Sequence, residues 1–83
     1  MTVNVKLFAI VKERAGVGEL SLELGEGATV AAAGRAIVER FAVLKDIEPR
    51  VAYAVNREYA NRETVLCDGD ELALIPPVSG GCA

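Results

Sequence analysis

The sequence predicts an α+β domain in which one helix packs on one face of a mixed sheet. Three observations point to this class. Two alternating segments near the N-terminus indicate strands, a following segment repeats apolar residues every three or four positions, and shorter alternating segments come after it. Hydrophobic residues make up 52% of the 83 residues and charged residues 25%, so the chain has enough apolar material for a compact core.

The first strand is expected to begin at Val3, because apolar and polar residues alternate from there to Phe8. Residues 9–11 extend the apolar run and are interpreted as part of the same strand. Alternation along such a strand would place Phe8 and Ile10 on one face. Residues 12–18 contain charges and two glycines, and they predict a turn whose first half forms a short helical piece.

A second strand is predicted over residues 20–24, where three leucines alternate with polar residues and favour antiparallel pairing with the first strand. Thr29 is a plausible N-cap for the helix that follows. The three- and four-residue spacing over residues 30–45 predicts an amphipathic helix of about four turns. Gly34 would permit close packing of this helix on the sheet, and Pro49 prevents the helix from running further.

Further strands are predicted over residues 51–56, over residues 59–60 as a short fourth strand, and over residues 71–75 as the last. The sequence Asp-Gly-Asp at 68–70 predicts a turn that leads into the last strand, which we interpret as an edge strand. Pro76 and Pro77 end it, because they remove two backbone donors.

This order of elements is that of the β-grasp, or ubiquitin-like, roll. The competing ferredoxin-like fold needs a second helix, which the sequence does not indicate. We therefore expect a β-grasp domain over residues 1–77 and a flexible tail over residues 78–83.

Composition and charge exclude several classes of function. Histidine is absent, which removes the commonest general base and any Ser/His or Cys/His pair, so no autonomous active site is expected. The net charge is −3 and the basic residues form no run, which argues against nucleic-acid binding. The longest apolar run, Leu7–Val11, is far shorter than the roughly 18 residues of a membrane span. No signal peptide is recognised and two cysteines make no disulfide framework, so we expect a cytoplasmic protein.

Four further features of the sequence are interpreted without a role in catalysis or metal binding. The fragments at residues 16–18 and 25–27 begin a phosphate-loop pattern without completing it, and are interpreted as turn glycines. The carboxylates of 68–71 do not match a calcium loop, so we expect a solvated turn and no metal site. Cys67 is interpreted as a small packing residue.

The predicted last strand and the first strand together suggest an exposed apolar face. If their core residues pack under the helix, alternation puts Phe8, Ile10, Ala73 and Ile75 on the opposite side of the sheet. Such a patch on a small monomer would be a docking surface. The alternatives are that a loop covers it or that a bulge shifts the register.

The C-terminus is the sharpest feature of the sequence. After the two prolines, Gly80 and Gly81 form a slim segment that could thread a narrow channel. The extended reach from Val78 to Gly81 is roughly 13–14 Å. It could carry a terminal carboxyl group into the active site of a partner. A frayed chain end is the alternative, and composition alone leaves both open.

Residues 5–16, 51–60 and 67–81, the last reading CDGDELALIPPVSGG, resemble the family of ubiquitin-like sulfur carriers that includes MoaD and ThiS. The resemblance spans nearly the whole chain to Gly81 and is greatest to the small subunit of molybdopterin synthase, MoaD. Thiamine carriers of the ThiS type resemble the chain less, because they are usually shorter and lack the double proline.

The resemblance implies a mechanism and partners. An adenylyltransferase of the MoeB or ThiF type, similar to ubiquitin-activating enzymes, would use ATP and Mg to adenylate the Gly81 carboxylate, which then becomes a thiocarboxylate. The thiocarboxylate would enter a MoaE-type large subunit, in a heterotetramer, and give sulfur for molybdopterin. The chain itself would bind no cofactor. The implied partner-docking residues are Phe8, Ile10, Ile75, Pro76, Pro77 and Val78.

The chain departs from this family at its end, because Cys82 and Ala83 follow Gly81, where the chemistry needs a free carboxylate. The resemblance implies a removable cap that a JAMM-type zinc metalloprotease would cleave. Capped carriers also serve other sulfur pathways, such as those to thiamine, cysteine or specialised metabolites. A ubiquitin-like protein modifier, a passive binding module and a thiol role for Cys82 stay open.

Overall fold

The computed structural model describes residues 1–77, and the predictions on Val78, Gly80, Gly81, Cys82 and Ala83 lie outside them. Two α-helices, two short 3₁₀ helices (η) and five strands make up the described part of the chain. In chain order these are β1 (Thr2–Leu7), α1 (Ala9–Ala15), β2 (Glu19–Glu23), α2 (Val30–Arg40), η1 (Ala42–Leu44), η2 (Glu48–Arg50), β3 (Ala52–Val55), β4 (Glu58–Ala60) and β5 (Glu71–Ile75).

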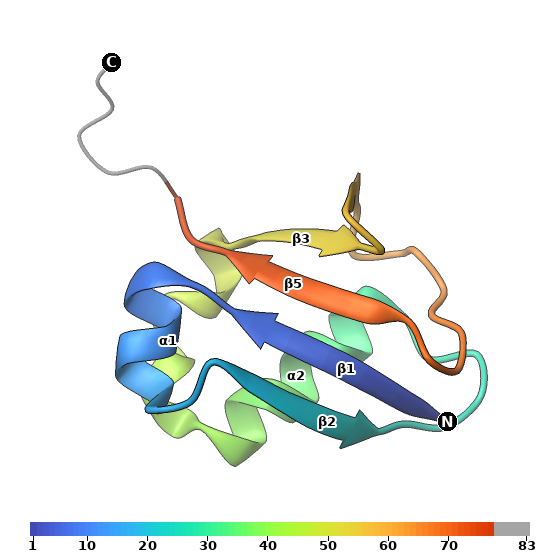
Figure 1. Ribbon diagram of the computed structural model, residues 1–83, viewed down its shortest axis with the longest axis horizontal. Helices are drawn as coiled ribbons and strands as arrows, with labels where there is room; N and C mark the ends of the chain where they lie inside the picture. Colours follow the sequence, from blue (N-terminus) through green and yellow to red (C-terminus); the bar gives the residue numbers. More distant parts are fainter. Residues whose placement is uncertain (78–83) are drawn as a thin grey trace.

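The strands form one mixed sheet in the order β2-β1-β5-β3-β4. The central pair, β1 and β5, is parallel, and the other neighbours are antiparallel. Helix α2 lies across one face of the sheet, and the opposite face is open (Figure 1). The predicted α+β class and β-grasp arrangement are confirmed. Within residues 1–77, no helix has the length and apolar character that crossing a membrane requires.

The position of β5 corrects one expectation, because β5 is a central strand and not an edge strand. Its sequence after Glu71 is apolar at every position to Ile75, and Leu72, Ala73 and Leu74 are all buried. Leu72 and Leu74 pack in the core, while the small Ala73 on the open face lies between longer neighbours, so the strand does not show the alternation of an exposed edge strand.

The core lies between α2 and the covered face of the sheet. Val5 and Leu72 are direct neighbours across the central parallel pair, and both are fully buried. Ile37 of α2 is also fully buried. The remaining fully or almost fully buried core side chains are Val3, Leu7, Val11, Val30, Ala33, Leu44, Leu66 and Leu74.

The prediction that the first strand continues through residues 9–11 is wrong. The strand ends at Leu7, and α1 begins at Ala9, whose φ is +50°. Val11 is fully buried from this helix, and Gly16 ends it in a left-handed conformation with φ +81°. A short run that is apolar at every position carries no period, so it did not distinguish a strand from the first turn of a helix.

The main helix begins as predicted and ends earlier. The Thr29 side chain accepts a hydrogen bond from the Ala32 amide at 3.3 Å, which confirms the N-cap. The helix stops at Arg40, because Phe41 leaves helical geometry at φ −127° and ψ 82°. The chain continues through η1, which buries Leu44. An α-helix and a 3₁₀ turn both bring positions three apart to one side, so the apolar spacing persisted beyond the end of α2.

Candidate functional site

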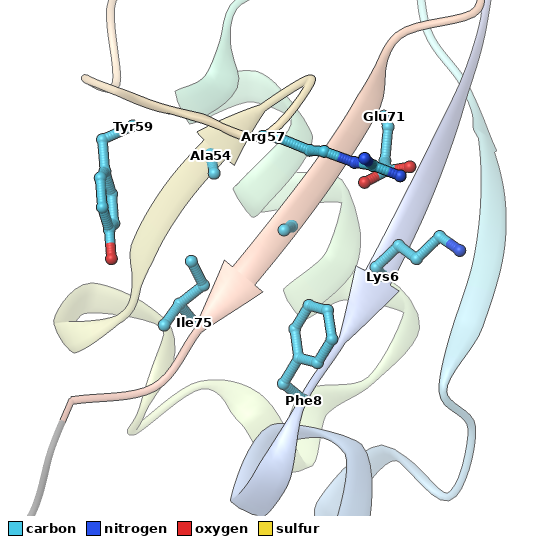
Figure 2. A pocket seen from close by; sticks show the side chains of 8 residues that line it. Lys6, Phe8, Ala54, Arg57, Tyr59, Glu71 and Ile75 are labelled. Atoms are coloured by element: carbon cyan, nitrogen blue, oxygen red, sulfur yellow. The ribbon is translucent and has the colours of Figure 1, made fainter.

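The open face of the sheet holds the larger of two hollows that concern function, and we call it the sheet hollow. A row of paired residues crosses its floor: Lys6 pairs with Ala73, Ala73 with Ala54, and Ala54 with Tyr59. The two alanines at the centre leave space between longer side chains on either side, which creates a shallow hollow of about 460 Å³. It is lined by Lys6, Phe8, Ala54, Arg57, Tyr59, Glu71, Ala73 and Ile75 (Figure 2).

The sheet hollow has an apolar end and a charged end. Figure 2 shows Phe8 and Ile75 near the point where β1 and β5 finish, Glu71 and the Arg57 side chain toward the other end, and Lys6 at the side, beside the end of β1. Phe8 is 46% exposed, and Tyr59 on the outer strand β4 is 79% exposed. Large aromatic side chains held at the rim of a shallow apolar floor are typical anchors of protein–protein contacts.

The structure brings together only part of the predicted docking set. Phe8, Ala73 and Ile75 share the open face, as alternation predicted. Ile10 does not, because it lies on α1 and lines no part of the sheet hollow. Among the residues that line the hollow, only Phe8, in the connection from β1 to α1, and Arg57, in the turn from β3 to β4, lie outside the strands. The docking role itself stays a prediction.

Sequence reasoning missed the residues that β3 and β4 contribute. Asn56 and Arg57, with φ of +52° and +72°, form the tight turn between these strands, and this turn sets the register that brings Tyr59 beside Ala54. The backbone geometry corresponds to a two-residue hairpin, which the polar Asn-Arg pair signals only weakly compared with Asn-Gly.

The second hollow lies at the root of the tail, and we call it the tail-root hollow. Pro77, the last described residue, lines it together with Arg14 of α1 and with Asp46, Ile47 and Arg50. Its volume is about 170 Å³. Pro76 and Pro77 follow β5 directly, so each hollow lies beside the end of this central strand.

A half-buried polar network fixes the segment that precedes β3. Glu48 accepts hydrogen bonds from the Tyr53 hydroxyl and from Arg62 Nη1, the latter at 2.7 Å. Burial raises the pKa of Glu48, but the hydrogen bonds from Tyr53 and Arg62 outweigh it and hold this pKa below its ordinary value. Burial and the Glu48 carboxylate raise the pKa of Tyr53, so the phenol keeps its proton. Gly34 of α2 leaves room for this network.

The carboxylates of the acidic turn before β5 accept hydrogen bonds from backbone amides and so fix the conformation of the chain there. The Asp68 carboxylate accepts from the Thr2 amide at 2.7 Å, and Asp70 accepts from the Cys67 amide at 2.8 Å. Gly69 adopts φ +85°, which confirms the predicted turn. Cys67 is exposed, so its interpretation as a packing residue is wrong. Strand β5 enters the sheet only after this turn, which leaves Cys67 outside the core.

The comparisons with known proteins agree on the relatives of this chain. It matches the ThiS family model over residues 5–81. A molybdopterin synthase sulfur carrier subunit from Chlamydomonas reinhardtii is 39% identical over 83 residues, covering 98% of this chain and 100% of the relative.

Two solved structures share its fold over nearly the whole length. SAMP1 from Haloferax volcanii has a TM-score of 0.88 at 32% identity, covering 98% of this chain and 100% of its own. A chain in the complex of subunits 1 and 2 of the molybdopterin-converting factor from Helicobacter pylori has a TM-score of 0.71 at 32% identity. That match covers 98% of this chain and 100% of the other.

Proposed function

This chain belongs to the ThiS family, and from that membership we propose that it is a sulfur carrier with Gly81 as its reactive end. The observation that carries the proposal is its similarity, over nearly its whole length, to a molybdopterin synthase sulfur carrier subunit. We propose molybdopterin synthesis as the pathway and a role as the small subunit of the synthase.

The chemistry requires a partner that activates the tail. The Gly81 carboxylate attacks the α-phosphorus of ATP and releases pyrophosphate, which leaves an acyl-adenylate. The terminal sulfur of a persulfide then displaces AMP, and a thiol cleaves the S–S bond, so that the carrier keeps a thiocarboxylate. Mg and ATP belong to a MoeB-type or ThiF-type adenylyltransferase, while this chain supplies the acyl group and the surface that is recognised.

We propose that Cys82 and Ala83 are a removable cap. The family match ends at Gly81 and leaves these two residues outside it. As long as Cys82 is attached, Gly81 carries a peptide bond, which has no carboxylate to attack ATP. A JAMM-type metalloprotease would supply the required hydrolysis.

The sheet hollow is our proposed docking surface for the partners. Its apolar end, with Phe8 and Ile75, lies next to the start of the tail, so a partner that holds this face also receives the tail. The complex of subunits 1 and 2 in the Helicobacter pylori relative supports a MoaE-type large subunit as one such partner. A heterotetramer of two small and two large subunits is the assembly we propose.

A second candidate function is conjugation to proteins, in which activated Gly81 forms an amide with a lysine. The similarity to SAMP1, whose full name is small archaeal modifier protein 1, favours it. Probing extracts for covalent adducts of higher mass separates this function from sulfur carriage, which leaves no such adducts.

Intact-mass spectrometry tests the sulfur-carrier proposal. The chain ending at Gly81 is incubated with its adenylyltransferase, Mg-ATP and a persulfide donor, and replacement of one oxygen by sulfur is expected. The matched control is the full-length chain, which retains Cys82 and Ala83. It should gain no sulfur when no protease is present. Sulfur loading of the intact chain, or no loading of the trimmed one, contradicts the mechanism.

A further inference from the structure

Carboxylates outnumber cations at the end of the molecule where β1 and β5 begin. Four carboxylates gather where β1 and β5 begin. Glu23 pairs with Thr2 across the sheet, and Asp68 accepts the Thr2 amide. The Asn4 amide donates to the Asp70 carbonyl, and Glu71 pairs with Asn4. The N-terminal ammonium group and the Arg57 side chain lie at the same end, so the four carboxylates leave it with a surplus of negative charge.

At the opposite end, where the tail begins, the lining of the tail-root hollow has the reverse character. Arg14 and Arg50 both line the tail-root hollow, and Asp46 is its single acidic lining residue, which leaves a surplus of one positive charge. The two ion pairs found within residues 1–77 are Lys6–Glu19 and Arg62–Glu48, so neither arginine of the hollow is paired there. Ile47 and Pro77 supply apolar walls beside them.

Resting on the proposed function, we infer that the tail-root hollow receives a carboxylate side chain from an acidic rim around the tail-binding channel of the adenylyltransferase. Arginine is suited to this role because its planar guanidinium binds carboxylates in a bidentate manner. Pro77 lines the same hollow, so a rim that engages Arg14 and Arg50 lies where the tail enters the partner.

The segregation of charge also orients the encounter. An acidic rim attracts the tail end of this chain and repels the carboxylates at the far end, so the two molecules meet tail first. Rim charges of this kind chiefly change association rates and their salt dependence. The sheet hollow would then supply the apolar contacts that keep the complex together.

Stopped-flow association of the full chain with the adenylyltransferase of the same organism tests the inference. Arg14→Glu and Arg50→Glu are each expected to slow association about threefold to tenfold at low ionic strength. The difference from wild type should shrink at about 0.5 M salt, where the Debye length is only a few ångströms. The matched control is Arg35→Glu on the exposed side of α2, which makes the same change in net charge outside the lining of the tail-root hollow.

The possible results distinguish a failure of the arginine contact from a failure of the sulfur-carrier function. Slower association of both tail-root variants, with Arg35→Glu near wild type, supports it. Equal rates for all three variants overturn it, provided that wild type binds and the trimmed chain is loaded with sulfur. A wild-type chain that neither binds nor loads contradicts the proposed function itself. Circular dichroism confirms that each variant is folded.

Discussion

A Cβ atom placed on Gly34 of α2 would lie 2.5 Å from the Tyr53 hydroxyl oxygen and 2.6 Å from a carboxylate oxygen of Glu48. Real Cβ atoms do not approach other atoms so closely. Because Gly34 has no side chain, the helix can pack directly against the hydrogen-bonded pair of Tyr53 and Glu48. This contact joins the helix layer to the segment that leads into β3.

Gly34→Ala is expected to lower the free energy of unfolding by about 1–3 kcal/mol, because the added methyl group overpacks a buried contact. In an exposed helix the same change would stabilise by about 0.5–1 kcal/mol, so the sign is diagnostic. Urea unfolding measures it, with Gly25→Ala as the control at a position with nothing within 4 Å. In a double-mutant cycle, Gly34→Ala should cost less stability when Tyr53→Phe has removed the hydroxyl group. An equal cost in both backgrounds would contradict the contact between residue 34 and Tyr53.

Stability is expected to fall in acid because of Glu48. Its pKa is lower in the folded protein than the ordinary value of 4.5, so the charged form stabilises the fold above pH 4.5. This contribution is lost as the pH falls through the depressed folded value. Chemical denaturation as a function of pH measures the effect. Glu48→Gln should be less stable at neutral pH and should show a shallower acid limb, whereas an identical acid limb would exclude Glu48 as its source.

Ala9 holds a left-handed conformation at φ +50° where the chain passes from β1 to α1. Such a conformation costs about 1–2 kcal/mol in a residue with a Cβ atom. Ala9→Gly should therefore raise the free energy of unfolding by about 0.5–1 kcal/mol, the remainder being lost to unfolded-state entropy. Thermal unfolding provides the measurement, and Ala9→Val should be destabilising. A destabilised Ala9→Gly variant would show that the backbone there is not strained.

Two matched substitutions test whether the partner binds the open face of the sheet or α1. Phe8→Ser should weaken binding to the large-subunit partner about tenfold or more, because Phe8 is an exposed anchor of the sheet hollow. Ile10→Ser removes a similarly exposed apolar side chain from α1, outside this hollow, and should leave binding near wild type. Isothermal titration calorimetry measures both. Equal losses would place Ile10 in the interface after all.

Much of the fold could be predicted from local patterns. The alternating leucines of β2, the Thr29 cap and the turn at Gly69 each depend on neighbours close in the sequence, and each is found as predicted. The secondary structure of the continuous apolar stretches was harder to predict, because these stretches show no periodicity. One of them was divided between β1 and α1, which moved Ile10 off the sheet.

The site was harder to predict than the fold, because its residues come together through strand order. Alternation indicated that Phe8 and Ile75 share a face, but only the register of β3 and β4 reveals the alanine floor and Tyr59. The tail-root hollow joins Arg14 and Arg50, which lie far apart in the sequence. The tail residues lie outside the described chain, so their chemistry still rests on the family.

The location of β5 has a consequence for how the molecule acquires its shape. This strand is the last along the described chain, yet it is inserted between β1 and β3 and pairs with a segment some 67 positions earlier, as Asn4 with Glu71. Such distant pairing is slow to form, because the intervening loop must first close. During synthesis the sheet is therefore incomplete until β5 has left the ribosome. A protein that recognises the complete open face will therefore not bind nascent chains that still lack β5.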